Sequence, residues 1–198
     1  MNFLAHAYLS FTIPDIVVGN MISDFVKGKK KYDYPPGIQN GIVLHRSIDE
    51  YTDRHPVTQE AKQAFRSSYG LYAGAFVDVA YDFFLANDTV VFPCAKDLES
   101  FSRYTYSILN AYSAFLPEGF KKILPHMEHQ DWLSNYRTEY GIQQSFGGLV
   151  RRAQYLTDSV PAFLAFKENY ALLQNCYTAF FPQLKSFATC QLSLFEPT

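Results

Sequence analysis

His45, Asp49 and Asp53 recur four residues apart, and Asp78 and Asp82 repeat this spacing further along the chain. On a helix, residues four apart lie one turn apart on the same face, so each set predicts a row of reactive side chains. The neighbours of the second set are apolar, which is typical of a buried helix. Buried carboxylates are costly unless a cation or hydrogen bonds compensate their charge. We therefore predict a divalent metal ion held between two helices.

Asp24 adds a third segment that carries a carboxylate, so the imidazole and carboxylate groups come from three separate parts of the chain. This donor set suits Mn²⁺, Mg²⁺ or Fe²⁺ better than structural zinc, which prefers thiolates. A water on an open position of such a metal has a lowered pKa and supplies hydroxide near neutral pH. Arg46 and Arg54 suit a phosphate, because a guanidinium matches phosphate oxygens in pairs. The residue types therefore favour metal-assisted hydrolysis of a phosphoester.

Each of these residues also has a purely structural interpretation. His45 alone is more often an ordinary helix residue than a ligand, and Asp49 or Asp53 can pair with arginines at helical spacing. Such ion pairs are common and only weakly stabilising. The two acids of the apolar segment, Asp78 and Asp82, are harder to explain in this way. They carry most of the argument for a metal.

The composition predicts a globular protein of one domain, residues 1–198, because 48% of the residues are hydrophobic. No apolar run approaches the length of a membrane span, and the N-terminal segment lacks the basic start of a signal peptide. The three cysteines, Cys94, Cys176 and Cys190, are odd in number and lack metal-site spacing. A reduced, cytoplasmic setting is the simplest account of them.

Lysines concentrate directly after Asp24, at Lys27, Lys29, Lys30 and Lys31, and we call these four the basic segment. The net charge of the chain is −2, which argues against a nucleic-acid binder. Two interpretations of the basic segment stay open: a solvated loop and a patch for an acidic partner.

Proline, glycine and capping residues predict helices throughout, and hence the all-α class. The expected helices cover residues 15–26, 37–52, a segment that starts near 58, 74–86, 97–115, 139–155 and 158–187. Pro117, Gly119 and Pro125 predict turns. The last helix carries apolar side chains three and four apart, which predicts core packing, and Pro182 is expected to kink it.

Five motifs follow one another within about the first 90 residues. They are Met1-Asn2-Phe3-Leu4-Ala5-His6, Gly19-Asn20-Met21-Ile22-Ser23-Asp24-Phe25-Val26-Lys27-Gly28, Gly41-Ile42-Val43-Leu44-His45-Arg46-Ser47-Ile48-Asp49, Thr52-Asp53-Arg54-His55-Pro56 and Asp78-Val79-Ala80-Tyr81-Asp82. In this order they resemble the acyl carrier protein phosphodiesterase family. Several motifs in the right order are a more specific signal than any single one.

The resemblance implies an all-helical, cytoplasmic, Mn²⁺-dependent enzyme, a single multi-helix domain that is a distorted relative of the HD-domain phosphohydrolases. Such an enzyme hydrolyses the phosphodiester between 4′-phosphopantetheine and a serine of holo-acyl carrier protein, a small acidic protein. The resemblance implies metal binding by Asp24, His45, Asp78 and Asp82. It implies catalytic or supporting roles for His6, Arg46, Asp49, Asp53 and His55. The basic residues add substrate-binding candidates, namely Arg46, Arg54, Lys27, Lys29 and Lys30.

One position departs from the family pattern. Phe83 directly follows Asp82, where family members often carry a histidine. If that histidine helps to hold metal or to protonate the leaving serine, activity here is weakened or rerouted.

Two other functions are weighed against this one. The first is an HD-like phosphohydrolase that acts on a nucleotide or another small phosphoester. The second is a non-enzymatic helical binding module whose acids are structural.

Gln191-Leu192-Ser193-Leu194-Phe195 resembles the short peptide by which bacterial proteins dock to the DNA sliding clamp. The favoured interpretation of these residues is instead an apolar tail that folds back on the core. Docking requires a free tail, because only an accessible peptide can present its anchoring side chains.

Overall fold

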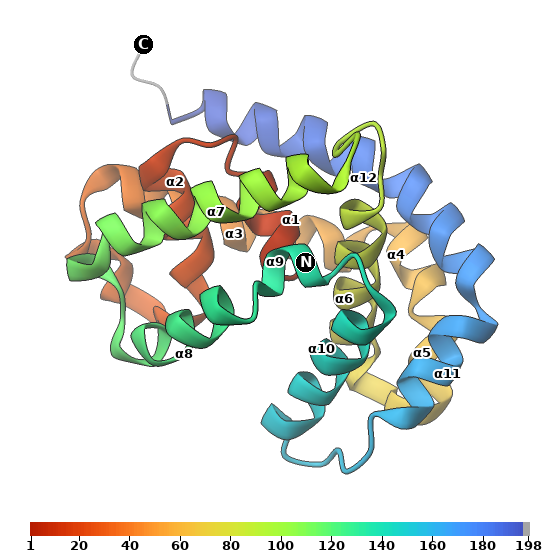
Figure 1. The fold of residues 1–198 in the computed structure, drawn as a ribbon. Coiled ribbons are helices and arrows are strands. Elements are labelled where there is room, and N and C mark those ends of the chain that lie inside the picture. Colours follow the sequence, from red (N-terminus) through yellow and green to blue (C-terminus); the bar gives the residue numbers. More distant parts are fainter. Residues whose placement is uncertain (196–198) are drawn as a thin grey trace.

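The computed structural model describes residues 1–195, and all the regular structure in this range is helical (Figure 1). This confirms the predicted all-α class. None of these helices combines the length and the apolar composition needed to cross a membrane. The α-helices of the described range are α1 Phe3–Tyr8, α2 Pro14–Ile22, α3 Pro36–Arg54, α4 Pro56–Ala61, α5 Gln63–Tyr69, α6 Ala73–Ala86, α7 Ala95–Ala111, α8 Glu118–His129, α9 Trp132–Asn135, α10 Glu139–Arg152, α11 Val160–Glu168 and α12 Tyr170–Ser193. The short 3₁₀ segments are η1 Ser23–Phe25, η2 Gly28–Asp33, η3 Gly70–Tyr72 and η4 Ser113–Phe115.

One hydrophobic core joins helices from both ends of the chain. The long helix α12 runs along one edge of the molecule and packs against α3, α4 and α6 (Figure 1). Its Phe180 stacks on Tyr81 of α6, with ring centroids 5.4 Å apart. Leu173, Tyr177 and Leu184 are buried on the same helix. The apolar stripe expected in this part of the sequence therefore lies in the core, as predicted.

The last expected helix is two helices rather than one, so this boundary prediction is wrong. α11 ends at Glu168 and α12 begins at Tyr170. Asn169, between them, donates its side-chain amide to the carbonyl of Ala165 at 2.9 Å. An asparagine side chain that bonds to nearby backbone competes with the helix, which explains the break. α12 continues through Pro182.

Gly119 and Pro125 do not mark turns, because both lie inside α8. Phe120, Leu124 and Met127 are spaced along one face of this helix, and all three are buried. Packing of this face outweighs the local preference of glycine and proline for turns. Propensity alone gave the wrong prediction here.

Helices α2 and α3 approach each other closely because glycines meet at their contact. A Cβ on Gly19 would lie 2.1 Å from the carbonyl oxygen of Ile38, and one on Gly41 would lie 2.5 Å from that of Ile16. Only a residue without a Cβ permits such an approach. The contact sets η1, which follows α2, beside the middle of α3.

The short helix α1 is held in place by buried polar groups. Asp82 of α6 accepts hydrogen bonds from the backbone N–H groups of Leu4 at 2.7 Å and Ala5 at 3.2 Å. The first N–H groups of a helix have no partner within the helix, so Asp82 satisfies two of them. Asn20 of α2 donates its amide to the carbonyl of His6 at 2.9 Å. These bonds bring α1 against α2 and α6.

The C-terminal peptide of residues 191–195 begins in the last turn of α12. Leu192 and Phe195 pack against the core, and Leu194 is exposed. This arrangement matches the apolar tail that folds back. Docking to a sliding clamp stays an untested prediction.

Candidate metal centre

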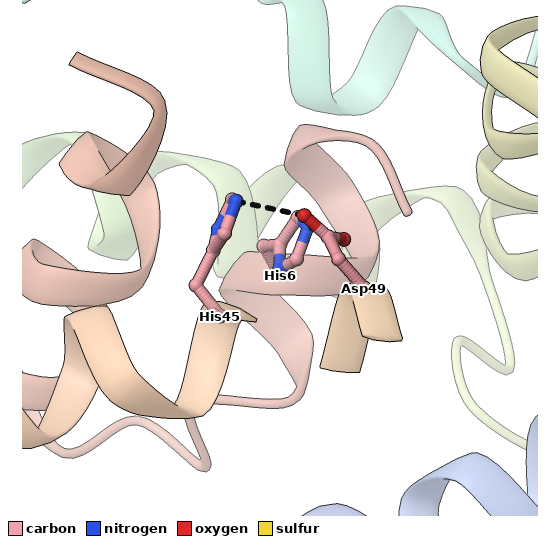
Figure 2. Close-up of side chains that lie close together, drawn as sticks. All are labelled: His6, His45 and Asp49. Carbon is pink, nitrogen blue, oxygen red and sulfur yellow. Dashed lines mark ion pairs between the residues drawn. The ribbon is translucent and has the colours of Figure 1, made fainter. Parts of the chain in front are cut away.

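His6, His45 and Asp49 lie together, His6 on α1 and the other two on α3 (Figure 2). Each offers one ligand atom, and these atoms all lie within 4.8 Å of one another. Asp49 bridges the two imidazoles: one carboxylate oxygen is 3.2 Å from His6 Nε2, and the other is 3.1 Å from His45 Nε2. The two rings stack with centroids 3.8 Å apart. We call these three residues the His–Asp cluster.

Asp24 extends the His–Asp cluster towards η1. Its Oδ1 atom lies 3.2 Å from His45 Nε2, so this nitrogen faces the carboxylates of both Asp24 and Asp49. The Asp24 side chain is 74% exposed, whereas His6 and His45 are buried. Solvent therefore reaches the cluster from the side of Asp24.

The environment of His6 fits a bound cation. Both its ring nitrogens are buried and make no hydrogen bond to any residue that the structure describes. Its Nε2 atom is close to Asp49 but lies outside hydrogen-bond geometry. A buried polar atom without a partner costs about 1–3 kcal/mol. A divalent cation among the three ligand atoms would give one of these nitrogens a partner, and imidazole with carboxylate is a suitable donor set.

The two stacked histidines differ in charge. Burial, together with the neighbouring His45, lowers the pKa of His6 to about 4. Burial also disfavours the charged form of His45, but hydrogen bonds to Asp24 and Asp49 outweigh it and raise the pKa of His45 to about 9. Near neutral pH, the metal-free protein therefore holds a neutral His6 beside a protonated His45. Only His45 must lose a proton before it can bind a metal.

The α-ammonium group of Met1 connects the cluster to α6. It lies 3.1 Å from an oxygen of Asp49 and 3.2 Å from an oxygen of Asp78. Burial disfavours this ammonium, but Asp78 and Asp49 outweigh burial and raise the pKa of the amine to about 11. In turn, the ammonium and the hydrogen bond from His45 outweigh the burial of Asp49 and hold the pKa of that carboxyl well below its ordinary value. The Met1 ammonium therefore lies between Asp78 and the Asp49 carboxylate of the His–Asp cluster.

Asp82 faces the first turn of α1, and it does not belong to the group of ligand atoms that the described residues form. Burial raises the pKa of Asp82 to about 7, although the N–H groups of Leu4 and Ala5 favour its charged form. Backbone hydrogen bonds thus offset part of the cost of burying this carboxyl. Its metal-binding role stays a prediction, while its contact with α1 positions His6.

Three candidates at the end of α3 have local partners. Asp53 accepts a hydrogen bond from Lys62 at 2.9 Å. Arg54 pairs with Glu50 at 2.7 Å on the surface. The ring of His55 caps the first turn of α4. None of the three belongs to the group of ligand atoms within residues 1–195.

The positively charged candidates follow Asp24 in the chain or face that segment. Arg46 donates from Nη2 to the carbonyl of Val26 at 2.8 Å, and no acid in the described range pairs with its guanidinium. Lys27, Lys29 and Lys30 are exposed, before and within η2. Positive charge is therefore available on the open side of the cluster.

Phe83, the position that departs from the family pattern, does not face the cluster. Its ring packs edge-on against Phe166 of α11, with centroids 5.2 Å apart. The side chain at this position belongs to an aromatic part of the core.

Two contributors were missed from the sequence. One is the carbonyl of Asn20, which lies 2.7 Å from His45 Nδ1, and the other is the Met1 ammonium. Both are backbone groups, so residue types and spacing carry no signal for them.

A model of the family described as acyl carrier protein phosphodiesterase matches residues 1–184. The match extends far beyond the motifs of the first part of the chain. A protein of Yersinia pestis named acyl carrier protein phosphodiesterase is 30% identical over 93% of this chain and 95% of its own length. One of Photorhabdus laumondii with the same name is 28% identical over 93% of both chains. No solved structure matches the chain significantly, so the likeness to HD-domain proteins stays a prediction.

Proposed function

This chain belongs to the acyl carrier protein phosphodiesterase family, and we propose that it hydrolyses the phosphodiester between 4′-phosphopantetheine and a serine of holo-acyl carrier protein. The products are the apo-protein and free 4′-phosphopantetheine. The observation that carries the proposal is the buried His6 without hydrogen bonds beside His45 and Asp49, in a chain of this family.

His6, His45 and Asp49 would hold a divalent cation, with Asp24 next to His45 on the open side. Mn²⁺ is our preferred ion on the resemblance. Fe²⁺ takes the same imidazole and carboxylate donors, whereas the alternative Mg²⁺ prefers oxygen ligands. When bound, the cation would polarise a phosphoryl oxygen and lower the pKa of a water. Asn20 supports the site, because its carbonyl accepts the Nδ1 proton of His45 and leaves Nε2 for the cation.

The remaining residues bind the phosphate. Arg46 has donors left beyond its bond to Val26, and these offset the charge that builds on the phosphoryl oxygens. The leaving serine needs a proton. Water at the cation would supply this proton, and Asp78 would stay ionised beside the Met1 ammonium. We assign no chemical step to Asp53, Arg54 or His55 and infer that they stabilise the end of α3.

The basic segment is the part of the proposal that concerns the protein partner. Its exposed lysines follow Asp24 directly, on the open side of the cluster, and would attract a small acidic protein. The cytoplasmic location predicted from the cysteines belongs to the same proposal. Docking to the sliding clamp is not part of this proposal, because Leu192 and Phe195 already contact the core.

The test is a gel-shift assay of purified holo-acyl carrier protein with Mn²⁺, with EDTA, and with the His45→Ala variant. We expect the wild type with Mn²⁺ to convert the carrier protein to the apo form and to release 4′-phosphopantetheine, detected by mass spectrometry. The EDTA and His45→Ala reactions should show neither. His129→Ala on α8 is the matched control and should remain active. Cleavage of small phosphoesters without any cleavage of the carrier protein would favour the small-phosphoester alternative. A protein that binds no divalent cation would favour the binding module.

A further inference from the structure

A pocket opens beside the start of α1, between α9 and α10, with a volume of about 340 Å³. This volume falls within the range of roughly 300–1,000 Å³ that small-molecule sites occupy. Asn2 and Phe3 form one wall of the pocket, directly after Met1. Since the Met1 ammonium contacts Asp49 and Asp78, the pocket begins next to the candidate metal centre. We call it the α9–α10 pocket.

A second lining residue, at the end of α9, lies near Asp82 of α6. Tyr136 is buried at the α9 end of the pocket. Burial, with Asp82 nearby, holds the pKa of Tyr136 well above its ordinary value. Phe3, which lines the pocket, directly precedes Leu4, whose N–H group donates to Asp82 at 2.7 Å. The pocket therefore lies on the Asp82 side of the centre, whereas the basic segment follows Asp24.

The wall of the α9–α10 pocket has a definite chemistry. Four of its side chains are amides, namely Asn2, Gln130, Asn135 and Gln144. Asn2 and Gln130 accept hydrogen bonds from Phe3 and Trp132, and Asn135 donates one to the carbonyl of Gln130. Their remaining amide groups, and both groups of Gln144, can pair with the C=O and N–H of an amide ligand. Trp132 and Phe3, with ring centroids 6.3 Å apart, add an apolar face. Such a wall suits a neutral, flexible ligand with amide groups and short aliphatic segments.

We propose that the α9–α10 pocket receives the pantetheine arm of the substrate, an inference that rests on the proposed function. The arm carries two amides, a hydroxyl, a branched aliphatic segment and a thiol. Its phosphate end would lie at the His–Asp cluster, and the serine and its protein on the Asp24 side. Arg151 and Arg152 also line the pocket and provide positive potential that attracts a phosphorylated ligand. The pocket would thus bind the pantetheine arm, which all holo-acyl carrier proteins share.

Two neighbouring glycines on α10 offer a matched test. Gly148 lines the pocket, whereas Gly147 does not. A Cβ on Gly148 would meet only the Arg151 guanidinium at 3.8 Å, and one on Gly147 would meet Arg151 at 3.4 Å and Ser159 at 3.8 Å. Both positions are helical, so a leucine there improves helix propensity. Gly148→Leu should therefore fold and fill the pocket, and Gly147→Leu should fold and leave it open.

The first readout is binding of free pantetheine, measured by ligand-observed NMR, and the second is kcat/KM on holo-acyl carrier protein. We expect Gly148→Leu to weaken pantetheine binding and kcat/KM by about tenfold or more, because a filled pocket excludes the arm. Gly147→Leu should stay within about twofold of the wild type. Gln144→Ala should lower both quantities by a smaller factor, against Gln143→Ala, which changes an exposed amide outside the pocket.

The outcomes separate this inference from the proposed function. A Gly148→Leu variant that binds pantetheine and cleaves the carrier protein like the wild type overturns the pocket assignment and leaves the function intact. A wild-type protein that does not bind pantetheine also overturns it. If the wild type cleaves no holo-acyl carrier protein, the proposed function fails, and pantetheine binding to wild type and to Gly148→Leu still decides the pocket.

Discussion

The Nδ1 atom of His45 lies 2.7 Å from the carbonyl oxygen of Asn20, and this contact determines which ring nitrogen is left for a metal. A carbonyl only accepts, so Nδ1 carries a proton. Nε2 then faces Asp24 and Asp49, and in the metal-free protein it carries a second proton. A cation at the His–Asp cluster would take the place of that second proton.

Metal binding should therefore release protons. The pKa of His45 is raised to about 9 and that of His6 is lowered to about 4, so only His45 is protonated at pH 7.5. We expect Mn²⁺ to displace about one proton at pH 7.5 and none above about pH 10, with affinity rising about tenfold per pH unit below pH 9. Calorimetry in two buffers of different ionisation enthalpy measures this number. Binding at pH 7.5 without proton release would contradict the assignment of His45 as a ligand.

His6→Leu should separate metal binding from stability. The substitution removes two buried nitrogens that make no hydrogen bond in the described structure, so the metal-free protein should keep or gain stability, by up to about 2 kcal/mol. Its affinity for Mn²⁺ should fall at least tenfold, because a ligand is lost. Urea unfolding in EDTA and calorimetry with Mn²⁺ give the two quantities.

His126→Ala serves as the control for this variant, since His126 is exposed on α8 and should affect neither quantity. A His6→Leu protein that binds Mn²⁺ normally would remove His6 from the ligand set. One that is destabilised without metal would show that His6 is well satisfied in solution.

The sequence predicted the helical class, because spacing and apolar context are local signals. It predicted a cation as the reason for the buried Asp82, whereas the structure pairs this carboxyl with the N–H groups of Leu4 and Ala5. The sequence put His6 among the catalytic candidates. In the structure, a ring nitrogen of His6 lies with the ligand atoms of His45 and Asp49, so His6 is a candidate metal ligand. Such pairings depend on which helix ends meet in space, and no spacing within one segment encodes that.

Gly19→Ala should damage the site from a distance. A Cβ at this position would lie 2.1 Å from the carbonyl oxygen of Ile38, so α2 and α3 must separate. We expect a loss of about 1–3 kcal/mol in unfolding free energy and weaker Mn²⁺ binding, because η1 carries Asp24 at the end of α2. Chemical denaturation measures the first effect. Gly147→Ala, at a half-buried position of α10 where a Cβ would come no closer than 3.4 Å to a side chain, is the control and should be neutral or stabilising.

Asp82→Ala should destabilise the protein by about 1–3 kcal/mol, since the N–H groups of Leu4 and Ala5 would be left buried without a partner. Asp82→Asn keeps one accepting oxygen and should lose less. Because α1 carries His6, both variants should also weaken Mn²⁺ binding, in the same order. Thermal unfolding in EDTA followed by metal titration tests this. Loss of metal binding in Asp82→Asn at full stability would instead make Asp82 a ligand.

Reversing charge in the basic segment should slow the reaction with the carrier protein. Lys29 and Lys30 are exposed and form no ion pair within residues 1–195, so their charges are available to an acidic partner. We expect Lys29→Glu/Lys30→Glu to lower kcat/KM on holo-acyl carrier protein about tenfold at low salt, mainly through slower association. The difference from the wild type should shrink as ionic strength rises, because salt screens exposed charges over about 10 Å at 0.1 M. Lys96→Glu/Lys122→Glu, which reverses two exposed lysines on α7 and α8, should change kcat/KM much less. Equal kcat/KM values for both double variants, with the same salt dependence, would show that the basic segment is only a solvated loop.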